Sequence, residues 1–550
     1  MGYGEDIPYM VKADFDQNYP FNKFCPDLDA AGCGPVAIAE ILSYYKSPPK
    51  GRGSVSYENP KNPGQLITAD LDNMPFDWDN ILNQYNANEY TGLQADAVAN
   101  LIYACGAAMR VAYGPSTSTQ NKNQLVYCLQ HNLCMSPDSR YLNRQYYSTS
   151  DWIEILNKQL RLGYPVFYRG SKIYDGSESG HMFVIDGMNE KGLYHANWGH
   201  GGYGNKYTDL DILNQGNANA LPGGRWTCYN FKQAMMINCY PTPEIEKYPL
   251  QWCDLYEPIR INDDDNINEI TIVSDQTFSL NTRVVNCSEE AMSVNCKFFL
   301  MKDGKEISRL SDVRFCNFRP YYIGKINTDI RLPKALPDGE YEIILFSKSD
   351  AEPDWKPVYD NPVNKIMVTI DNDRAKIYSP SCHAGNPCLY FPEPIEVERV
   401  DTGIELKCIF ANPTINNFSD IVRFSITTDK GIFQHEALVC VYSQTESRYG
   451  ILISDSQLSL SQANIISISA AYRYGNDEAY FHIGDSNISA ILYPEATDIA
   501  KDIHVYDITG KLMGCIKATE IASGLQPFIS SLPHGIYILV EGKKTRKIIR

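Results

Sequence analysis

Apolar residues recur at the spacing of an α-helix in three segments of the first 240 residues. In residues 35–46 they fall near a period of about 3.6, and Pro35 suits the first turn of a helix. Residues 93–109 and 150–163 repeat this pattern. Ser150 is a suitable N-cap for the last segment, and Gly163 is a suitable end. The pattern therefore predicts three helices.

Short apolar runs follow these helical segments. Residues 164–170, 181–187 and 193–199 read as strands, because they are brief, apolar and bounded by turn residues. The sequence MNEKG at 188–192 is a hairpin signal between the last two runs. Helices early and an antiparallel sheet late predict an α+β domain over residues 1–242.

The pattern changes after residues 240–251, which contain three prolines and little periodicity and therefore read as a linker. Beyond it the helical period disappears, and short alternating strands are separated by turns. This is typical of β-sandwiches. We expect a multidomain chain in which the α+β domain precedes all-β, immunoglobulin-like sandwiches at 253–372 and 376–487. A small β module is expected at 488–550.

Length and charge narrow the classes of function. A chain of 550 residues is too long for one core. Its net charge of −17 argues against nucleic acid as a partner, because phosphate contacts need clustered Lys and Arg. No apolar run reaches the roughly 20 residues of a membrane span. The first residues also lack the pattern of a signal peptide, which predicts either a cytosolic protein or a mature or truncated form.

The 16 cysteines do not form a zinc-binding pattern, since none has the C-x2-C spacing of structural zinc sites. We therefore expect no metal site. The pairs Cys287/Cys296 and Cys382/Cys388 are close enough in sequence to be disulfide candidates. Free, buried thiols explain the same residues equally well.

Cys33 stands between Gly32 and Gly34 where the first helical pattern begins. A helix N-terminus stabilises a thiolate through its unpaired N–H groups and its dipole. The flanking glycines leave room for a substrate carbonyl. On its position alone, Cys33 is either a nucleophile or a small buried packing residue.

A base for this thiol is found further along the chain. His181 opens an apolar strand directly after the glycine- and serine-rich residues 174–180 and should border a cleft. Asn197 lies across the predicted hairpin, where it could orient the ring, and Trp198 could shield that contact from water. A Cys followed by His and Asn at such separations is the papain-type arrangement. A neutral His would accept the thiol proton.

At this point the sequence resembles a known family, the streptopain-like cysteine peptidases (peptidase family C10, papain fold). The resemblance covers about residues 8–240 and lies in motifs that keep the family's order. They are DFDQNYPFN, AAGCGPVAIAEIL, VAYGPSTST, GHMFVIDG and YHANWGHGGYG. It implies an endopeptidase that needs no cofactor and acts on proteins or peptides, with an apolar residue preferred two positions before the scissile bond.

The resemblance also implies a role for each matched residue. Cys33 is the nucleophile, His181 the general base and acid, and Asn197 the residue that orients it. Trp198 shields their contact, and Gln17 is the oxyanion-hole donor beside the backbone N–H of Cys33. Such a donor is typically worth about 2.7–4 kcal/mol in the transition state.

Two glycine- and serine-rich segments are expected to wall the substrate cleft. They are residues 114–119, with Gly114 and Ser116, and residues 171–180, which end at Gly180. Both also read as ordinary surface turns. The chain departs from the family at His200, where a second Trp is usual. The resemblance therefore does not imply the family's cleft wall, or its specificity, at this position. His195 is expected to be structural.

The C-terminal sequence VYDITGKLM…LPHGIYILVEGKKTRKIIR resembles the sorting domain of type IX secretion cargo. An ordinary terminal β-sandwich is the alternative. The resemblance implies a bacterial protein that is secreted or attached to the outer-membrane surface, from which signal and inhibitory propeptide are absent.

Two other functions remain open. One is a transglutaminase-like acyltransferase, in which an amine replaces water as the acceptor. The other is an adhesin or binding protein whose peptidase domain is inactive. The joint presence of Cys33, His181 and Asn197 argues against the second.

Overall fold

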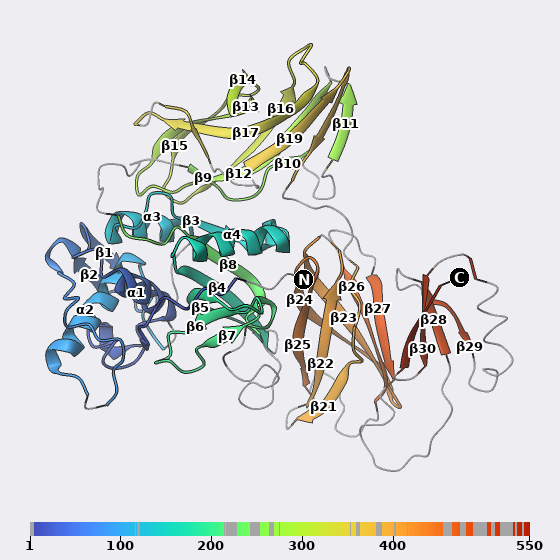
Figure 1. The fold of residues 1–550 in the computed structure, drawn as a ribbon, viewed down its shortest axis with the longest axis horizontal. Coiled ribbons are helices and arrows are strands. Elements are labelled where there is room, and N and C mark those ends of the chain that lie inside the picture. Colours follow the sequence, from blue (N-terminus) through green and yellow to red (C-terminus); the bar gives the residue numbers. More distant parts are fainter. Residues whose placement is uncertain are drawn as a thin grey trace. The chain divides into compact units, whose positions relative to one another are not determined.

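The computed structural model contains an α/β region followed by antiparallel sheets (Figure 1). It describes residues 5–549 apart from 88, 116, 118–121, 175–176, 214, 216–227, 243–252, 263–268, 274–275, 352–353, 359–363, 381–387, 401–402, 415, 455–464, 474–479, 488–502, 508–511, 517–531, 534–535 and 542–543. The chain divides into two compact units, one of residues 1–170, 180–215 and 232–385, the other of residues 171–179, 216–231 and 386–550. The predicted linker at 240–251 falls mostly outside the described residues.

The predicted helices are present, together with one that the pattern missed. The helices are α1 (Cys33–Tyr45), α2 (Gly92–Ala108), α3 (Lys122–Leu133) and α4 (Thr149–Arg161). Short 3₁₀ turns lie at Pro26–Leu28, Leu71–Asn73, Arg144–Tyr146 and Leu210–Ile212. The N-cap of α4 is Ser148 and not Ser150, because the Ser148 hydroxyl accepts the backbone N–H of Asp151 at 3.1 Å. The sequence-based cap was therefore wrong by two residues.

A six-stranded sheet forms the centre of the α/β region. A separate two-stranded hairpin, β1 (Ser54–Glu58) with β2 (Leu66–Asp70), precedes it along the chain. The sheet order is β3-β8-β4-β5-β6-β7. The bounds are β3 (Arg140–Asn143), β4 (Val166–Tyr174), β5 (Ser177–Met188), β6 (Tyr194–Asn197), β7 (Lys206–Thr208) and β8 (Phe231–Ile237). The predicted β5–β6 hairpin is present, but β5 already begins at Ser177, so His181 lies within the strand rather than at its start.

Alternation along the central strands places helices on both faces of this sheet. Phe167 of β4 and Val184 of β5 belong to the core that also contains the buried face of α1. Tyr168, the next residue of β4, instead accepts a hydrogen bond from the indole N–H of Trp152 on α4 at 3.0 Å. Since neighbouring residues of a strand face opposite sides, α1 and α4 cover opposite faces. The N-terminus of α1 is thereby fixed against β4 and β5.

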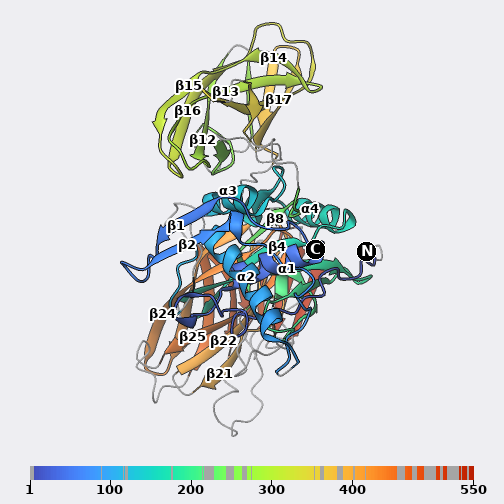
Figure 2. The same ribbon diagram turned by 90° about the vertical axis from the view of Figure 1, so that its left-hand side faces the viewer.

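From residue 253 onward, the described part of the chain forms antiparallel sheets and no α-helix. The strands between residues 253 and 378 form two sheets, which Figure 2 shows from a second direction. One sheet has the order β10-β12-β16 with β9 on β12, and the other β11-β20-β19-β17-β13-β14 with β15 and β18 at its side. The bounds are β9 (Cys253–Leu255), β10 (Arg260–Ile261), β11 (Glu269–Val273), β12 (Thr277–Asn286), β13 (Met292–Lys302), β14 (Lys305–Arg309), β15 (Val313–Phe318), β16 (Ile323–Arg331), β17 (Gly339–Ser349), β18 (Lys356–Pro357), β19 (Lys365–Asp371) and β20 (Arg374–Tyr378).

The remaining strands form three further sheets, in the orders β21-β22-β25, β24-β23-β26-β27 and β29-β28-β30-β31. Their bounds are β21 (Glu396–Val400), β22 (Gly403–Asn412), β23 (Phe418–Thr428), β24 (Gly431–Val441), β25 (Thr445–Ser454), β26 (Ile465–Arg473), β27 (Tyr480–Asn487), β28 (Ile503–Asp507), β29 (Leu512–Ile516), β30 (Ile536–Glu541) and β31 (Lys544–Ile549). The predicted all-β second half is confirmed. The immunoglobulin-like topology and the sorting role of the last module stay predictions.

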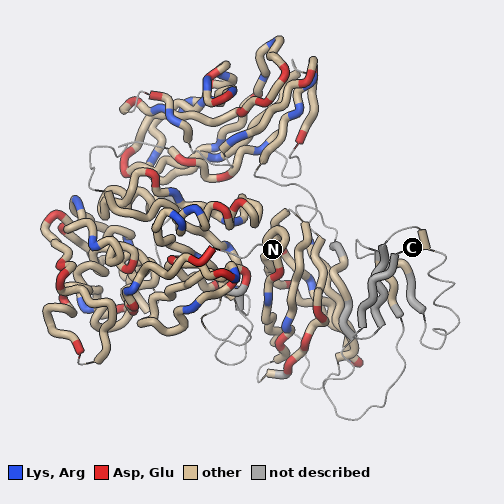
Figure 3. Tube along the Cα trace, in the orientation of Figure 1, with Lys and Arg blue, Asp and Glu red and all other residues tan. Residues whose placement is uncertain are grey.

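Basic and acidic residues are interspersed along the described chain (Figure 3). No described helix is long and apolar enough to cross a membrane. Cys287 and Cys296 are not bridged to each other, and Cys382 lies outside the described residues. Cys287 directly follows β12, and its thiol contacts the backbone carbonyl of Val285.

Candidate active site

Cys33 is the first residue of α1, where unpaired N–H groups of the helix are available. The residue before it, Gly32, has a φ of +94°, a conformation that side chains rarely adopt. A Cβ at Gly32 would also lie 2.9 Å from the hydroxyl of Thr117. Glycine is therefore required here for two reasons, and residue 117 lies against the loop that presents the thiol.

The surroundings of the Cys33 thiol act on its pKa in both directions. Burial raises the pKa, while hydrogen bonds from the backbone N–H groups of Met182, Gly34 and Cys33 lower it, as does the charge of Arg169; the net direction is upward. At the N-terminus of α1, burial of the thiol thus outweighs the hydrogen-bond donors that face it. The contact with Met182 places the thiol beside the residue that follows His181.

His181 lies on β5 in an aromatic setting and is 6% exposed. Its ring is stacked with those of Phe183 and Trp198, at centroid distances of 6.0 and 5.8 Å. The Nε2 atom lies 2.9 Å from the backbone carbonyl oxygen of Trp198. Since a carbonyl only accepts, Nε2 carries a proton, so Nδ1 is the ring nitrogen that can act as a general base when the ring is neutral.

Asn197 is the last residue of β6, and its side chain bonds three other groups. Its amide donates to the carbonyl of Ala13 at 2.7 Å, and its Oδ1 accepts from the N–H of Gly199 at 3.2 Å and from the Asn205 side chain at 3.1 Å. The acceptor for His181 is the carbonyl of Trp198, one residue further along. Asn197 thus braces the turn that carries this acceptor. Trp198 is fully buried over the histidine ring, as a shield would be.

Glu40 is a residue of this site that the sequence analysis missed. It lies two helical turns after Cys33 in α1 and is fully buried. Its Oε1 accepts the backbone N–H of Phe15 at 3.1 Å. Burial raises the pKa of Glu40 well above its ordinary value, although the Phe15 N–H and the Asn197 side chain lower it. The sequence did contain a signal for Glu40, because it is the single acidic residue in the apolar run PVAIAEIL.

Gln17 lies at the end of the N-terminal segment, where it is half-buried. Its backbone carbonyl accepts the N–H of Ala31 at 2.8 Å, which ties it to the loop before Cys33. Of the predicted cleft residues, Gly114 is half-buried and Gly180 is exposed. Ser116 lies outside the described residues. Thr117, from the same predicted segment, is the residue found against Gly32.

His200 lies beside the catalytic candidate His181, with a centroid distance of 4.9 Å, and is bonded to the side chain of Gln215. Burial lowers the pKa of His200, while Asp16 and the bond to Gln215 raise it; the net direction is downward. His195, expected to be structural, lies 2.6 Å from the carboxylate of Asp186 through Nδ1. It is buried and forms no part of the arrangement around Cys33 described above.

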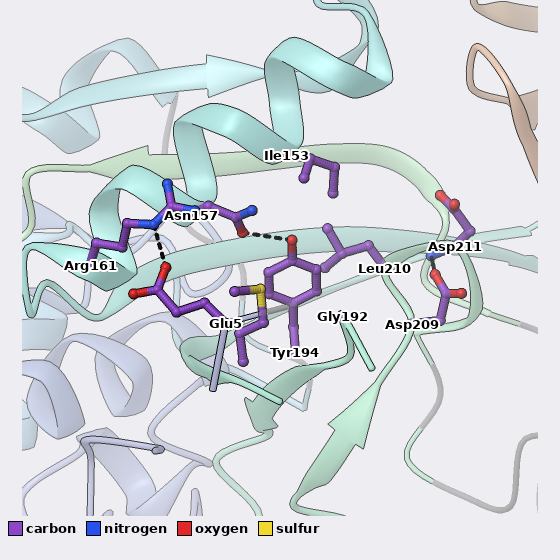
Figure 4. Close-up of a pocket in the computed structure, with 10 residues that line it drawn as sticks. Glu5, Ile153, Asn157, Arg161, Gly192, Tyr194, Asp209, Leu210 and Asp211 are labelled. Atoms are coloured by element: carbon purple, nitrogen blue, oxygen red, sulfur yellow. Dashed lines mark hydrogen bonds and ion pairs between the residues drawn. The ribbon is translucent and has the colours of Figure 1, made fainter. Parts of the chain in front are cut away.

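Figure 4 shows a pocket of about 420 Å³ that the described residues of α4, the β5–β6 hairpin and the segment after β7 form. Its lining includes Arg161, which pairs with Glu5 at 2.6 Å, and Tyr194, whose hydroxyl donates to Asn157 at 2.8 Å. None of the predicted site residues lines it. Among the described residues, no cluster of His, Cys, Asp and Glu has the geometry of a metal site.

The N-terminal part of the chain is similar to known proteins. The model of the Peptidase C10 family matches residues 15–208. Interpain A of Prevotella intermedia, a cysteine protease of known structure, is 30% identical over 43% of this chain and 96% of its own, with a TM-score of 0.40. The chain belongs to the peptidase C10 family. It is thereby a member of a family of cysteine-type peptidases, and its N-terminal part has the papain-like fold of that family.

Two curated relatives extend the comparison. Streptopain of Streptococcus pyogenes is 29% identical over 248 residues, which are 41% of this chain and 60% of that protein. The thiol protease/hemagglutinin PrtT of Porphyromonas gingivalis is 25% identical over 381 residues, 65% of this chain and 40% of that protein. This C10 chain therefore spans about 60% of the length of the streptopain it matches.

Proposed function

We propose that this chain is a secreted cysteine endopeptidase that cleaves peptide bonds through Cys33. The observation that carries the proposal is the position of the thiol, at the N-terminus of α1 and in hydrogen-bonding contact with the backbone of Met182, directly after His181. Membership in the C10 family supports the reaction class. The proposed secreted location is supported by the similarity to bacterial proteases, among them PrtT and interpain A.

The reaction begins when Nδ1 of His181 accepts the Cys33 proton and the sulfur attacks the substrate carbonyl. The N–H of Cys33 and the Gln17 amide stabilise the oxyanion. His181 then gives the proton to the leaving amine, which leaves a thioester. Water, deprotonated by the same imidazole, hydrolyses the thioester and restores the thiol. Because burial raises the pKa of Cys33, the proton transfer to His181 is essential to this scheme.

Trp198 and Asn197 support His181 in this scheme. The Trp198 carbonyl holds Nε2–H, which keeps the tautomer in which Nδ1 is the base. Asn197 acts through the turn it braces and transfers no proton. Gly114, Thr117 and Gly180 border the cleft in this proposal, and an apolar residue is preferred two positions before the scissile bond, as in the family resemblance.

Labelling with an epoxide inhibitor of papain-type enzymes, followed by peptide mapping, tests the nucleophile. We expect modification of Cys33 alone, because the proposed base His181 can accept its proton, whereas burial raises the pKa of Cys25, Cys128 and Cys239 to about 12. Modification elsewhere with Cys33 untouched contradicts the proposal. Assaying hydrolysis and amine incorporation in parallel separates the peptidase from a transglutaminase-like acyltransferase.

A further inference from the structure

The segment before Gln17 is held by a set of buried polar contacts that the proposed reaction does not use. Residues 7–16 bond the end of β5, where Ile7 pairs with Met188 and the Met10 N–H donates to the backbone carbonyl of Asp186. Further along, the carbonyl of Phe15 accepts the N–H of Gly201. Val11, Ala13 and Phe15 alternate into the core and are at most 2% exposed. The segment therefore is a fixed part of the fold, and the position of Gln17 depends on how it is held.

The first contact that holds residues 7–16 is made by the Asp186 carboxylate, which bonds both this segment and His195. The carboxylate of Asp186, fully buried on β5, accepts the N–H of Val11 at 2.7 Å through Oδ2. The other oxygen lies 2.6 Å from Nδ1 of His195 on β6. Tyr9 covers this pair, stacked on the His195 ring at 4.4 Å. One carboxylate thus joins both strands of the hairpin to the N-terminal segment.

Close backbone packing completes the anchor. A Cβ at Gly187 would lie 2.8 Å from the backbone N and Cα of Tyr9. Any side chain there displaces the segment, since such contacts are closer than real Cβ atoms approach. Downstream, the Ala13 carbonyl accepts from Asn197 and the Phe15 N–H donates to Glu40, so the segment is tied to the site at its other end.

We propose that the Asp186–His195 pair with Tyr9 is a clasp that positions the N-terminal segment and, through it, the oxyanion donor Gln17. His195 and Asp186 are positioning residues in this scheme and touch no reacting atom. The inference rests on the proposed function of the site. It predicts that loosening the clasp impairs oxyanion stabilisation while the nucleophile stays intact.

The test compares two reactions of the same thiol in the full chain. Alkylation by iodoacetamide needs the Cys33–His181 pair but no oxyanion hole, whereas hydrolysis of a peptide amide needs both. We expect Asp186→Ala, His195→Ala and Gly187→Ala each to lower kcat by about tenfold to hundredfold, because a small misplacement of a catalytic group has this effect. Alkylation rates at Cys33 should stay within about twofold of wild type.

Four further variants make the result specific. Gln17→Ala should show the same split, and its combination with His195→Ala should lose little beyond Gln17→Ala alone, since both act through one group. His195→Gln, which retains a donor for Asp186, should recover most of kcat. Arg161→Ala removes the exposed pair with Glu5 at the start of the same segment and should leave both rates unchanged.

Clasp variants that hydrolyse peptide at the wild-type rate overturn the clasp, provided the wild type is active. Equal losses in alkylation and hydrolysis also overturn it, because they show general damage to the site. A wild type that hydrolyses no peptide contradicts the proposed function instead, so the two failures are distinguishable.

A second, independent observation concerns the first sandwich. Cys253 on β9 and Cys296 on β13 belong to different sheets, yet both side chains lie in one apolar core and are 2% and 0% exposed. Their thiols are within hydrogen-bonding reach of each other. The sequence candidate Cys287 lies outside this core, although it is nearer to Cys296 along the chain.

We propose that Cys253 and Cys296 form an inter-sheet disulfide when the chain folds in an oxidising compartment. The two S–H bonds break and one S–S bond forms. The two electrons and two protons pass to an external disulfide, such as oxidised glutathione, which becomes two thiols. The bridge would join the two sheets through the centre of their core.

Peptide mapping of the full chain, produced in a bacterial periplasm and alkylated in denaturant without reductant, tests this bridge. We expect a linked peptide containing Cys253 and Cys296 and no alkylation of either residue. Cys296→Ser should free Cys253 for alkylation, while Cys287→Ser should leave the link in place. Complete alkylation of Cys253 in the wild type, or a link from Cys296 to Cys287, overturns the proposal.

Discussion

The α/β region and the first β-sandwich both have buried cores, but they bury different kinds of side chain. Among the described residues, the α/β region buries the ionisable side chains of Glu40, Arg144, His181, Asp186 and His195, each at most 7% exposed. The inward faces of β13 and β17 carry apolar side chains almost throughout. A buried ionisable group is costly unless it is bonded, so its concentration in one region marks where geometry matters more than stability.

The comparison is sharpest at two buried glutamates. Glu40 on α1 bonds the segment that leads to Gln17, and Glu405 on β22 lies 2% exposed in the second sandwich. Both are exceptions to the rule that carboxylates stay at the surface. Only Glu40 contacts elements of the active site. Equivalent substitutions at the two positions therefore separate effects on chemistry from effects on folding.

The largest effect is expected at the reacting residues. Cys33→Ala and His181→Ala should each lower kcat/KM by more than about 10³-fold, because one removes the nucleophile and the other its base. Circular dichroism and the melting temperature should stay close to wild type. Cys316→Ala, which removes an exposed thiol of the first sandwich, is the matched control and should retain full activity. Normal activity in Cys33→Ala or His181→Ala would end the assignment.

Glu40→Ala should destabilise the protein by about 2–4 kcal/mol, since it leaves a cavity and an unbonded Phe15 N–H. It should also lower kcat, because the segment that carries Gln17 loses a contact. Glu405→Ala should destabilise without changing kcat/KM at a temperature where both variants are folded. Chemical denaturation and steady-state kinetics check both, and a loss of kcat in Glu405→Ala would erase the contrast between the regions.

Asn197→Ala should lower kcat by about tenfold to hundredfold, less than His181→Ala does. Asn197 braces the turn at Trp198, and the carbonyl that holds His181 stays in the chain. The measurement is kcat/KM for a small peptide substrate, with melting temperature as the check on folding. A loss equal to that of His181→Ala would mean that Asn197 has a more direct role.

Glu40→Gln should reveal the titration of the buried carboxyl. Burial raises the pKa of Glu40 above its ordinary value of 4.5, so folding favours its neutral form. That stability is present below 4.5 and is lost as pH rises toward the folded-state pKa. Gln does not titrate, so the melting temperature of Glu40→Gln relative to wild type should rise between about pH 5 and about pH 8. A difference independent of pH contradicts this.

The smallest effect is expected from removing the β-rich half. A fragment of residues 1–242 contains every proposed catalytic residue and should hydrolyse a small peptide at a rate similar to the full chain. The grouping of residues 216–231 with residues 386–550 makes this a demanding test, because Phe231 packs with Cys440 and Tyr442. A folded but inactive fragment would show that the β-rich half completes the site.

The resemblance to type IX cargo leads to a separate expectation for the last residues. Deleting 488–550 from the natural precursor should leave an active enzyme that is retained in the cell envelope. Fractionation with an activity assay measures this. Unimpeded secretion would show that the module has no sorting role.

Local signals in the sequence were sufficient for much of the site. Pro35 and the helical period predict a helix next to Cys33, and the apolar run after His181 predicts its strand, since periodicity and caps depend on neighbouring residues. The order of the motifs identified the family. The α3 helix was missed although Leu125, Leu129 and Leu133 recur every fourth residue and are buried. The α4 cap was misplaced by two residues because two serines compete there.

Contacts between distant residues were decided by the tertiary structure alone. Whether Asn197 or the Trp198 carbonyl bonds His181 depends on the register of β5 against β6, in which Asn197 pairs with Val184. That Cys253 rather than Cys287 faces Cys296 depends on how two sheets stack. The sequence by itself predicted which residues carry the proposed chemistry. Their partners followed only from packing, because hydrogen bonds and burial act through space and leave no local pattern.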